Sequence, residues 1–434
     1  MEILSRTIAD FGPDIVGVGV RSYLDDYFGD ISMAVRRVAP EALFVCGGYG
    51  PTLNSELYLT WGDVVVAGDG EHAIVALADG VRDGNLDFSV VPGAVWKENG
   101  RIRRVPPEQF KDLDELPFPI YHTRDICMID KDVLYDPADW AVWDYTTLLA
   151  RGCIGECSYC SAGQIYDILR QQGCKTVKRR YRSVGRVIDE LKTQLNGRDI
   201  RVNFQDSYLT GPRDYLMEFF ERYRREVAKP FLAQLYPPQV LQYPEILQAA
   251  LGAGLFSTVV GVQSGSEFVR RNLYNRRISN EQTMAFAQMC HEYDIVKQYH
   301  VIAGCPIETE EQFKESASYV ATLPFRKDCD QLLVFQFYTF PKTPIRQMII
   351  EAGLEGLGKR YRNMNADPMV FMRQAMFYQI GVYGGPTALE KTFAHPSQGD
   401  LRWLEKYSRT TVRHGQCSCG DTERAVTTMC EIHQ

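Results

Sequence analysis

From residue 184 to residue 337, short apolar runs typical of buried strands alternate with segments typical of helices. The runs show little polar alternation, which indicates strands covered on both faces, as in a parallel sheet. We expect strands over residues 200–204, 231–235, 257–262, 296–302 and 331–337, and helices over 184–195, 212–226, 244–253, 280–293 and 309–322. Together with the apolar run before Cys153, the pattern predicts six β/α units, that is, an α/β fold with a partial (β/α)6 barrel. In a parallel barrel the functional loops follow the C-terminal ends of the strands.

The N-terminal part of the chain shows the same alternation on a smaller scale. We expect helices over 1–11, 29–38 and 71–81, strands over 14–20, 42–46 and 63–67, and a hairpin over 93–105 that turns at Asn99-Gly100. Such strands predict a Rossmann-like sheet with helices on both faces. The chain is therefore expected to divide into a Rossmann-like domain (residues 1–95), a linker (96–142), the barrel (143–340) and a mostly helical C-terminal region (341–434).

Three cysteines follow the apolar run 146–150 within one short loop. Cys153, Cys157 and Cys160 have the spacing C-x3-C-x2-C. Four thiolates would complete the shell of a structural zinc or of an ordinary ferredoxin cluster. Three thiolates on one loop can hold a [4Fe-4S] cluster and leave its fourth iron open to a non-protein ligand. A zinc site with a distant fourth ligand, or plain buried thiols, stay open as alternatives.

Composition narrows the class of protein further. The formal net charge of −7 gives no basic field that would attract nucleic acid or an anionic membrane, so we expect neither as a partner. No apolar run is long enough to span a bilayer, and the N-terminus has no apolar core of a signal peptide. The twelve cysteines are then expected to be reduced thiols or metal ligands in a cytoplasmic protein.

The cysteine loop resembles that of the radical S-adenosylmethionine (SAM) enzymes, in which SAM chelates the open iron of the cluster. Tyr159 matches the aromatic residue that usually precedes the third cysteine. The resemblance extends over about residues 145–344 and is to the branch that includes methylthiotransferases and cobalamin-dependent enzymes. It implies that Asp206 faces the SAM site. It also implies that the ribose and methionine of SAM lie along a run after the fourth strand, which contains Gln263, Ser264 and Glu267. The adenine is then expected near Gly304, in the turn after the fifth strand. The sequence departs from the family at Cys305-Pro-Ile307, where Leu-Pro-Gly is usual, and we interpret Cys305 as a small buried thiol.

The N-terminal region resembles a cobalamin-binding domain. Ser22 and Leu24 match its Ser-x-Leu positions, and Gly47 and Gly48 match its Gly-Gly, which border the pocket for the nucleotide tail. Gly68-Asp-Gly-Glu71 is also similar to the cobalamin-type radical SAM proteins. The domain is expected to be truncated, without the first strand–helix–strand unit, and no Asp-x-His-x-x-Gly element supplies a lower axial histidine. A scaffold that binds no corrin is the alternative.

These resemblances imply an enzyme that cleaves SAM reductively at a [4Fe-4S] cluster, with cobalamin as a third cofactor if the truncated domain still binds it. The implied reaction is methylation of an unactivated carbon or phosphorus in a small molecule or peptide, with electrons from a donor such as flavodoxin or ferredoxin. The alternatives are a cobalamin-independent rearrangement, cyclisation or epimerisation, and a non-catalytic iron–sulfur or zinc scaffold. The motifs after strands four and five speak against a scaffold, and no further catalytic residue is assigned.

Two other patterns have both a plain and a functional interpretation. The basic run Lys175–Arg182 predicts a solvated loop, or alternatively a site that captures an anion. The C-terminal residues His414, Cys417, Cys419, Cys430 and His433 predict reduced thiols, or alternatively a zinc or second cluster.

Overall fold

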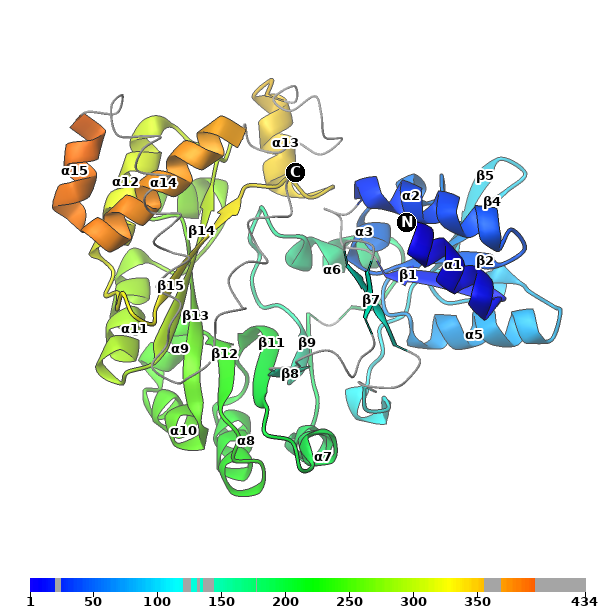
Figure 1. The fold of residues 1–434 in the computed structure, drawn as a ribbon, viewed down its shortest axis with the longest axis horizontal. Helices are drawn as coiled ribbons and strands as arrows, with labels where there is room; N and C mark the ends of the chain where they lie inside the picture. Colours follow the sequence, from blue (N-terminus) through cyan, green and yellow to red (C-terminus); the bar gives the residue numbers. More distant parts are fainter. Residues whose placement is uncertain are drawn as a thin grey trace. The chain divides into compact units, whose positions relative to one another are not determined.

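The structure is a computed structural model of the 434-residue chain. It describes residues 1–19, 25–119, 126–130, 133–135, 144–176, 178–354 and 368–394. The chain forms two compact units (Figure 1): unit 1 contains residues 1–200 and 339–348, and unit 2 contains residues 201–338 and 349–434. The four predicted domain ranges stay a prediction.

Unit 1 begins with a five-stranded sheet in the order β1-β2-β3-β4-β5. The first three strands are parallel: β1 (Ile15–Gly19), β2 (Leu43–Gly47) and β3 (Val64–Val66). The last two are antiparallel: β4 (Ala94–Glu98) and β5 (Arg101–Arg104). They form the predicted hairpin, whose turn residues Asn99 and Gly100 have positive φ angles of 51° and 76°. This turn suits the twist of paired strands, and it explains why Asn-Gly was a strong signal.

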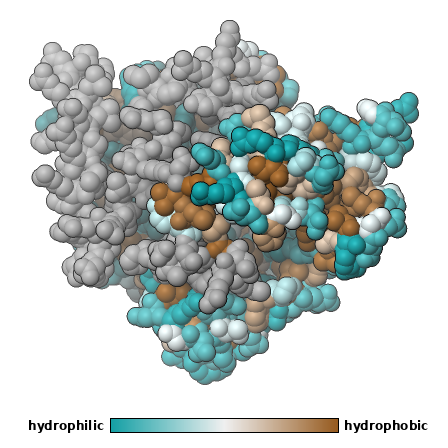
Figure 2. Space-filling view, turned by 45° about the vertical axis from the view of Figure 1, so that its right-hand side comes forward, coloured by the Kyte–Doolittle hydropathy of each residue, from teal (hydrophilic) through white to brown (hydrophobic). Residues whose placement is uncertain are grey.

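Helices cover both faces of this sheet, as the sequence predicts. On one face, α1 (Glu2–Phe11), α2 (Asp25–Val38) and α4 (Ser55–Tyr58) pack over Phe44 and Cys46. On the other face, α5 (Glu71–Arg82) packs over strand residues that alternate with these, namely Val45, Val64 and Val66. Each fully buried side chain of this size contributes about 1.5–3 kcal/mol. On the face in Figure 2, hydrophobic and hydrophilic residues are interspersed over the described parts of the chain.

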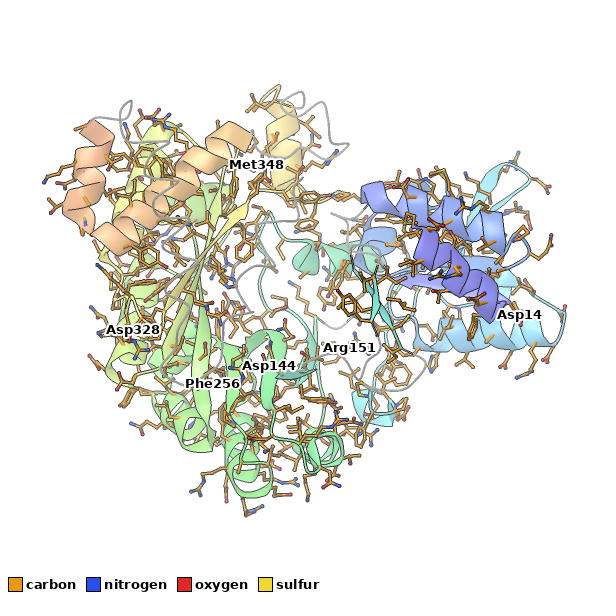
Figure 3. All side chains as sticks on the ribbon, viewed as in Figure 1. Asp14, Asp144, Arg151, Phe256, Asp328 and Met348 are labelled. Atoms are coloured by element: carbon orange, nitrogen blue, oxygen red, sulfur yellow. The ribbon has the colours of Figure 1, made fainter. Side chains whose placement is uncertain are left out.

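The second part of unit 1 holds the cysteine loop. The strand predicted before Cys153 is in fact two short strands, β8 (Asp144–Thr147) and β9 (Ala150–Gly152), because β9 turns away to pair with β10 (Arg179–Tyr181). Asp144 and Arg151, in these two strands, are labelled in Figure 3. The loop leads directly into α6 (Ser161–Gln171), and α7 (Val184–Leu195) follows β10. The other described elements of unit 1 are α3 (Tyr49–Leu53), two 3-10 turns (Phe88–Val90 and Leu113–Glu115) and the hairpin of β6 (Met128–Asp130) and β7 (Val133–Tyr135).

A buried carboxylate fixes α7 to the strand that precedes the loop. Glu190 is 1% exposed and accepts hydrogen bonds from the Tyr145 hydroxyl (3.0 Å) and the Thr147 hydroxyl (2.7 Å). Arg182 pairs with the same carboxylate. The charge is therefore both paired and hydrogen-bonded, which is the condition for its burial.

Unit 2 contains a curled parallel sheet. Five strands are neighbours in chain order: β11 (Arg201–Leu209), β12 (Phe231–Leu235), β13 (Leu255–Gln263), β14 (Val296–Ala303) and β15 (Gln331–Gln336). The helices between them are α8 (Arg213–Glu226), α9 (Pro237–Gln242), α10 (Glu245–Ala253), α11 (Asn280–Glu292) and α12 (Glu310–Thr322). Figure 1 shows α8, α10 and α11 along the outer side of the sheet. The predicted α/β fold with a partial barrel is confirmed.

The C-terminal region is helical where the structure describes it. Its helices are α13 (Pro344–Glu351), α14 (Pro368–Gly384) and α15 (Pro386–Ala394). The cysteine and histidine tail after residue 394 lies outside the described residues. Among the described helices, none is both long and apolar enough to cross a bilayer.

Candidate functional site

The three cysteines lie on one short loop, and the backbone of this loop at Gly155 lies beside two of their sulfur atoms. All three are partly exposed. The Gly155 amide donates to Cys153 Sγ over 3.3 Å, and a Cβ on Gly155 would lie 3.5 Å from Cys153 Sγ and 3.7 Å from Cys157 Sγ. These are ordinary van der Waals distances, so the backbone at Gly155 lies beside both sulfur atoms with room for a small side chain. In the described residues, no three His, Cys, Asp or Glu side chains are grouped tightly enough for a single metal ion.

The start of the loop tolerates no side chain at Gly152. This residue has a φ of 105°, and a Cβ there would overlap the Lys178 carbonyl and the Tyr166 hydroxyl. The end of the loop is fixed by α6, which begins after Cys160, and by the Ile345 amide, which donates to the Ser158 carbonyl over 3.3 Å. Both ends of the cysteine loop are therefore anchored within unit 1.

Two acidic residues after β3 attach the N-terminal sheet to the cysteine loop. Glu71, the first residue of α5, pairs with Arg151 at 2.6 Å, and Asp69 pairs with Arg180 at 2.5 Å. Arg180 is only 8% exposed. Asp69 also accepts from the Phe110 amide over 2.8 Å. The resemblance singled out the run from Gly68 to Glu71, but it did not indicate these arginine partners.

The basic run is a solvated loop at Lys175, as the sequence predicted, but not at its C-terminal end. Residues Arg179–Tyr181 form β10, whose register places Arg179 opposite Gly152 in β9. Arg180 is buried because Asp69, 111 positions away in the chain, compensates its charge. That partner is invisible in the local pattern, which shows only a row of cations.

β1 and β2 each end in a glycine, and there is free space where a side chain would begin at either position. Gly19 and Gly47 are register partners, and a Cβ on either would meet no atom within 4 Å. Gly48 follows with φ 94° and ψ −165°, a conformation that is essentially restricted to glycine. In sheets of this class, ligands bind outside the carboxyl ends of the strands. The predicted partners Ser22 and Leu24 lie outside the described residues.

In unit 2, β13 ends in a strained residue that is one of the predicted SAM contacts. Gln263 has a φ of 65°, which is uncommon for a residue other than glycine and often marks a functional position. A Cβ on Gly261 would lie 3.0 Å from Gln263 Nε2, 2.9 Å from Arg276 Nη2 and 3.4 Å from Gln234 Nε2. Gly261 therefore lets three nitrogen atoms converge. Arg276 Nη2 already donates to the Tyr208 hydroxyl over 2.8 Å and to the Gly261 carbonyl, so the side-chain amides of Gln234 and Gln263 are the groups that could bind hydroxyl or carboxylate oxygens.

The next two predicted residues are engaged within the protein. Ser264 is fully buried and its hydroxyl donates to that of Ser316 over 3.3 Å. Glu267 accepts from the Asn280 amide over 3.0 Å, at the start of α11. It also pairs with Arg271 at 3.0 Å and with the buried Arg270. These contacts shape the loop, and the sequence pattern did not reveal them.

The turn after β14 holds Gly304 and two buried acidic groups. The Gly304 amide donates to Gln374 Oε1 over 2.5 Å, so a helix of the C-terminal region supports this turn. Burial raises the pKa of the Cys305 thiol to about 12, which agrees with its interpretation as a buried thiol. Burial also raises the pKa of Glu308 to about 8. Asp206, on β11, is 4% exposed.

Residues 147–320 match the family model described as the radical SAM superfamily. This part of the chain is a radical SAM domain. A domain of this superfamily implies a [4Fe-4S] cluster and SAM, and the donor set of the cysteine loop fits the cluster: three accessible thiols, with an amide donor and a glycine beside them. The roles of the individual residues stay predictions.

Solved structures with the same fold include two cobalamin-dependent enzymes. One is the radical SAM methyltransferase TsrM from Kitasatospora setae, solved with cobalamin and a [4Fe-4S] cluster bound. It is 18% identical in sequence, its TM-score is 0.60, and the match covers 81% of this chain and 66% of TsrM. A second TsrM structure, with tryptophan and a SAM analogue, has a TM-score of 0.61 over 81% of this chain and 67% of that chain at 18% identity. The other is OxsB with aqua-cobalamin, with 14% identity, a TM-score of 0.63 and coverage of 94% of this chain and 64% of OxsB. No curated protein matches the sequence.

Proposed function

We propose that the chain is a cobalamin-dependent radical SAM methyltransferase that methylates an unactivated carbon or phosphorus of a small molecule or peptide. The observation that carries this proposal is the direct attachment of the N-terminal sheet to the cysteine loop within unit 1. Arg151 lies two residues before Cys153 and pairs with Glu71, which follows the third strand of that sheet. A sheet that served only as a remote scaffold would not need this contact.

The strand ends and the cysteine loop are close in the same unit. Tyr49 follows the Gly47-Gly48 turn and opens α3, which packs against α6. Half of the Tyr49 residue is exposed, but burial of its hydroxyl group raises the pKa of that group. The negative charges that Cys160 and Cys153 carry when ionised raise this pKa further. A flat cofactor over Gly19 and Gly47 would therefore lie beside the thiolates. The fold of the chain is also that of TsrM and OxsB, both of which were solved with cobalamin.

In this proposal the chain's own residues bind and orient the cofactors. Cys153, Cys157 and Cys160 hold the cluster, and the side-chain amides of Gln234 and Gln263 bind oxygen atoms of SAM, while Arg276 holds the Gly261 carbonyl beside them. When bound, the cluster and SAM supply a 5′-deoxyadenosyl radical, and cobalamin supplies the methyl group. Electrons would come from a protein such as flavodoxin or ferredoxin, in the reducing cytoplasmic setting that thiolate ligands require.

The first prediction concerns the cluster. Replacing Cys153, Cys157 and Cys160 with Ala should remove the iron and the brown chromophore from anaerobically purified protein, together with SAM cleavage, because no thiolate of the loop remains. The matched control is Cys127→Ala/Cys329→Ala, at two cysteines outside the loop that are not fully buried. It should keep its iron. Four irons per chain in the triple variant would contradict the assignment and would point to the C-terminal cysteines.

The second prediction concerns cobalamin. Titration of the anaerobic protein with hydroxocobalamin should give a bound spectrum, and Gly47→Trp should abolish it because the indole would fill the space over the strand ends. Gly252→Trp is the control: Gly252 lies in α10, and a Cβ there also meets no atom within 4 Å. No binding by the wild-type chain at high micromolar corrin would exclude methyl transfer through cobalt. A cobalamin-free rearrangement, cyclisation or epimerisation would then replace it.

A further inference from the structure

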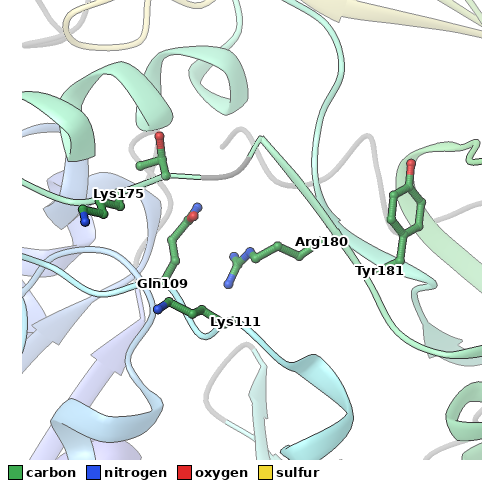
Figure 4. A pocket seen from close by; sticks show the side chains of 6 residues that line it. Gln109, Lys111, Lys175, Arg180 and Tyr181 are labelled. Carbon is green, nitrogen blue, oxygen red and sulfur yellow. The ribbon is translucent and has the colours of Figure 1, made fainter.

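We propose that a cavity of about 430 Å³ in unit 1 binds the phosphate group of a small organic phosphomonoester. The cavity is lined by Gln109, Lys111, Lys175, Thr176, Arg180 and Tyr181. In Figure 4, the side chain of Arg180 extends toward the side of the cavity where Gln109, Lys111 and Lys175 lie, and Tyr181 lies on the opposite side. The lining residues of the cavity lie outside the cysteine loop and the strands of the N-terminal sheet, although Arg180 pairs with Asp69, which follows β3. The site does not depend on the proposed methyl transfer.

The charges at the cavity indicate the charge of the ligand. Arg180 is neutralised by Asp69, which it contacts at 2.5 Å and 3.4 Å. Lys111 and Lys175 are both exposed, and neither has a carboxylate partner in the described part of the chain. The cavity therefore has an excess of about two positive charges. A phosphomonoester carries about −1.5 to −2 charges at pH 7 and matches this excess, whereas a monocarboxylate does not.

The lining also offers directed donors for phosphate oxygens. Arg180 is 8% exposed, and its buried Nε has no hydrogen-bond partner in the described residues. An unsatisfied buried donor is costly, so such a group points to a missing acceptor. Thr176 adds a hydroxyl at the same wall. Arginine with lysines and a hydroxyl is a donor set that suits phosphate, which accepts several charge-assisted hydrogen bonds at once.

The size of the cavity favours an organic phosphate over the inorganic ion. Pockets for small molecules are typically about 300–1,000 Å³, and the cavity lies within this range. Inorganic phosphate would leave most of this space unused. We therefore expect the phosphate to anchor a larger molecule whose organic part occupies the remaining volume.

Binding can be measured directly on the anaerobically purified, iron-containing chain by calorimetry in a buffer free of phosphate and sulfate. The probes are glycerol 3-phosphate, inorganic phosphate and malonate, a dicarboxylate of similar charge. Glycerol 3-phosphate should bind most tightly, and Lys111→Gln/Lys175→Gln should weaken it at least tenfold. The control Lys327→Gln/Lys391→Gln removes the same charge from two exposed lysines of unit 2 and should leave the affinity unchanged.

Several outcomes would overturn the proposal. Malonate binding as tightly as glycerol 3-phosphate would reject recognition of phosphate, and inorganic phosphate binding as tightly would reject an organic ligand. Equal losses in the two lysine variants would mean only a general charge effect, which salt would screen. Unchanged thermal unfolding of both variants ensures that a lost affinity reports on the cavity, since the substituted lysines are exposed.

Discussion

Glu308 shows how one residue can make stability depend on pH. Both of its carboxylate oxygens are buried, and neither has a hydrogen-bond partner in the described residues. Desolvation disfavours the charged form, so burial raises the pKa of Glu308 from 4.5 to about 8. In the unfolded chain the same carboxyl would titrate near its ordinary value. Between these two values the folded protein keeps a proton that the unfolded chain has released.

The sign of the effect follows from this difference. The folded pKa is above the unfolded one, so the contribution to stability is fully present below about pH 4.5 and is lost as the pH rises toward about 8. Glu308→Gln removes the titration and keeps the shape of the side chain. We predict that this variant gains stability relative to the wild type between pH 6 and pH 8, as measured by urea unfolding. Glu292→Gln, at an exposed residue, should show no such gain, and a pH-independent difference for Glu308→Gln would contradict the prediction.

The predicted SAM contacts show which properties of a residue are readable from sequence. The resemblance located Gln263, Ser264 and Glu267 in one loop, and the structure places them after β13. Their partners were not readable, because Ser316 and Asn280 come from other helices. Glu267→Ala would remove a helix contact and the partner of a buried arginine, so a loss of SAM affinity in that variant would not isolate ligand binding. Gln263, whose backbone is strained and whose amide nitrogen lies in the donor group, is the sharper position to probe.

At the scale of elements, periodicity predicted the long elements of both units well. The strand Phe231–Leu235 and the helix Val184–Leu195 have the expected bounds, because each has a run of buried residues and a clear turn signal at its ends. The helix Ser161–Gln171 was not predicted. It starts after a cysteine that makes no side-chain capping hydrogen bond, so no start signal is visible in the sequence. Gly163 also weakens the helical pattern. A Cβ there would lie close to the Gly155 carbonyl, which leaves little room for a side chain. The strand β10 was missed because its burial depends on Asp69, a partner far away in the sequence.

At the scale of the whole molecule, unit 1 is built from two separate stretches of chain, residues 1–200 and 339–348. The first stretch holds the N-terminal sheet and the cysteine loop, and in the second the Ile345 amide donates to the carbonyl of Ser158, between the second and third cysteines. Local patterns indicate each stretch but not their association, which rests on ion pairs and backbone contacts across long sequence separations. Asp69 is central, because its carboxylate contacts Arg180 and the Phe110 amide and lies 3.8 Å from Arg151.

The last prediction tests this association. Asp69→Asn leaves the buried Arg180 without its counter-charge, and breaking a largely buried pair should cost roughly 2–4 kcal/mol. Hydrogen–deuterium exchange should therefore quicken in β3 and β9 together, with a parallel loss of iron, while β12 to β14 of unit 2 keep their protection. The control is Asp79→Asn, whose pair with Arg82 is solvent-exposed and should be worth at most about 1 kcal/mol. Faster exchange in β3 alone, with β9 and the iron unaffected, would show that the sheet and the cysteine loop are stabilised independently.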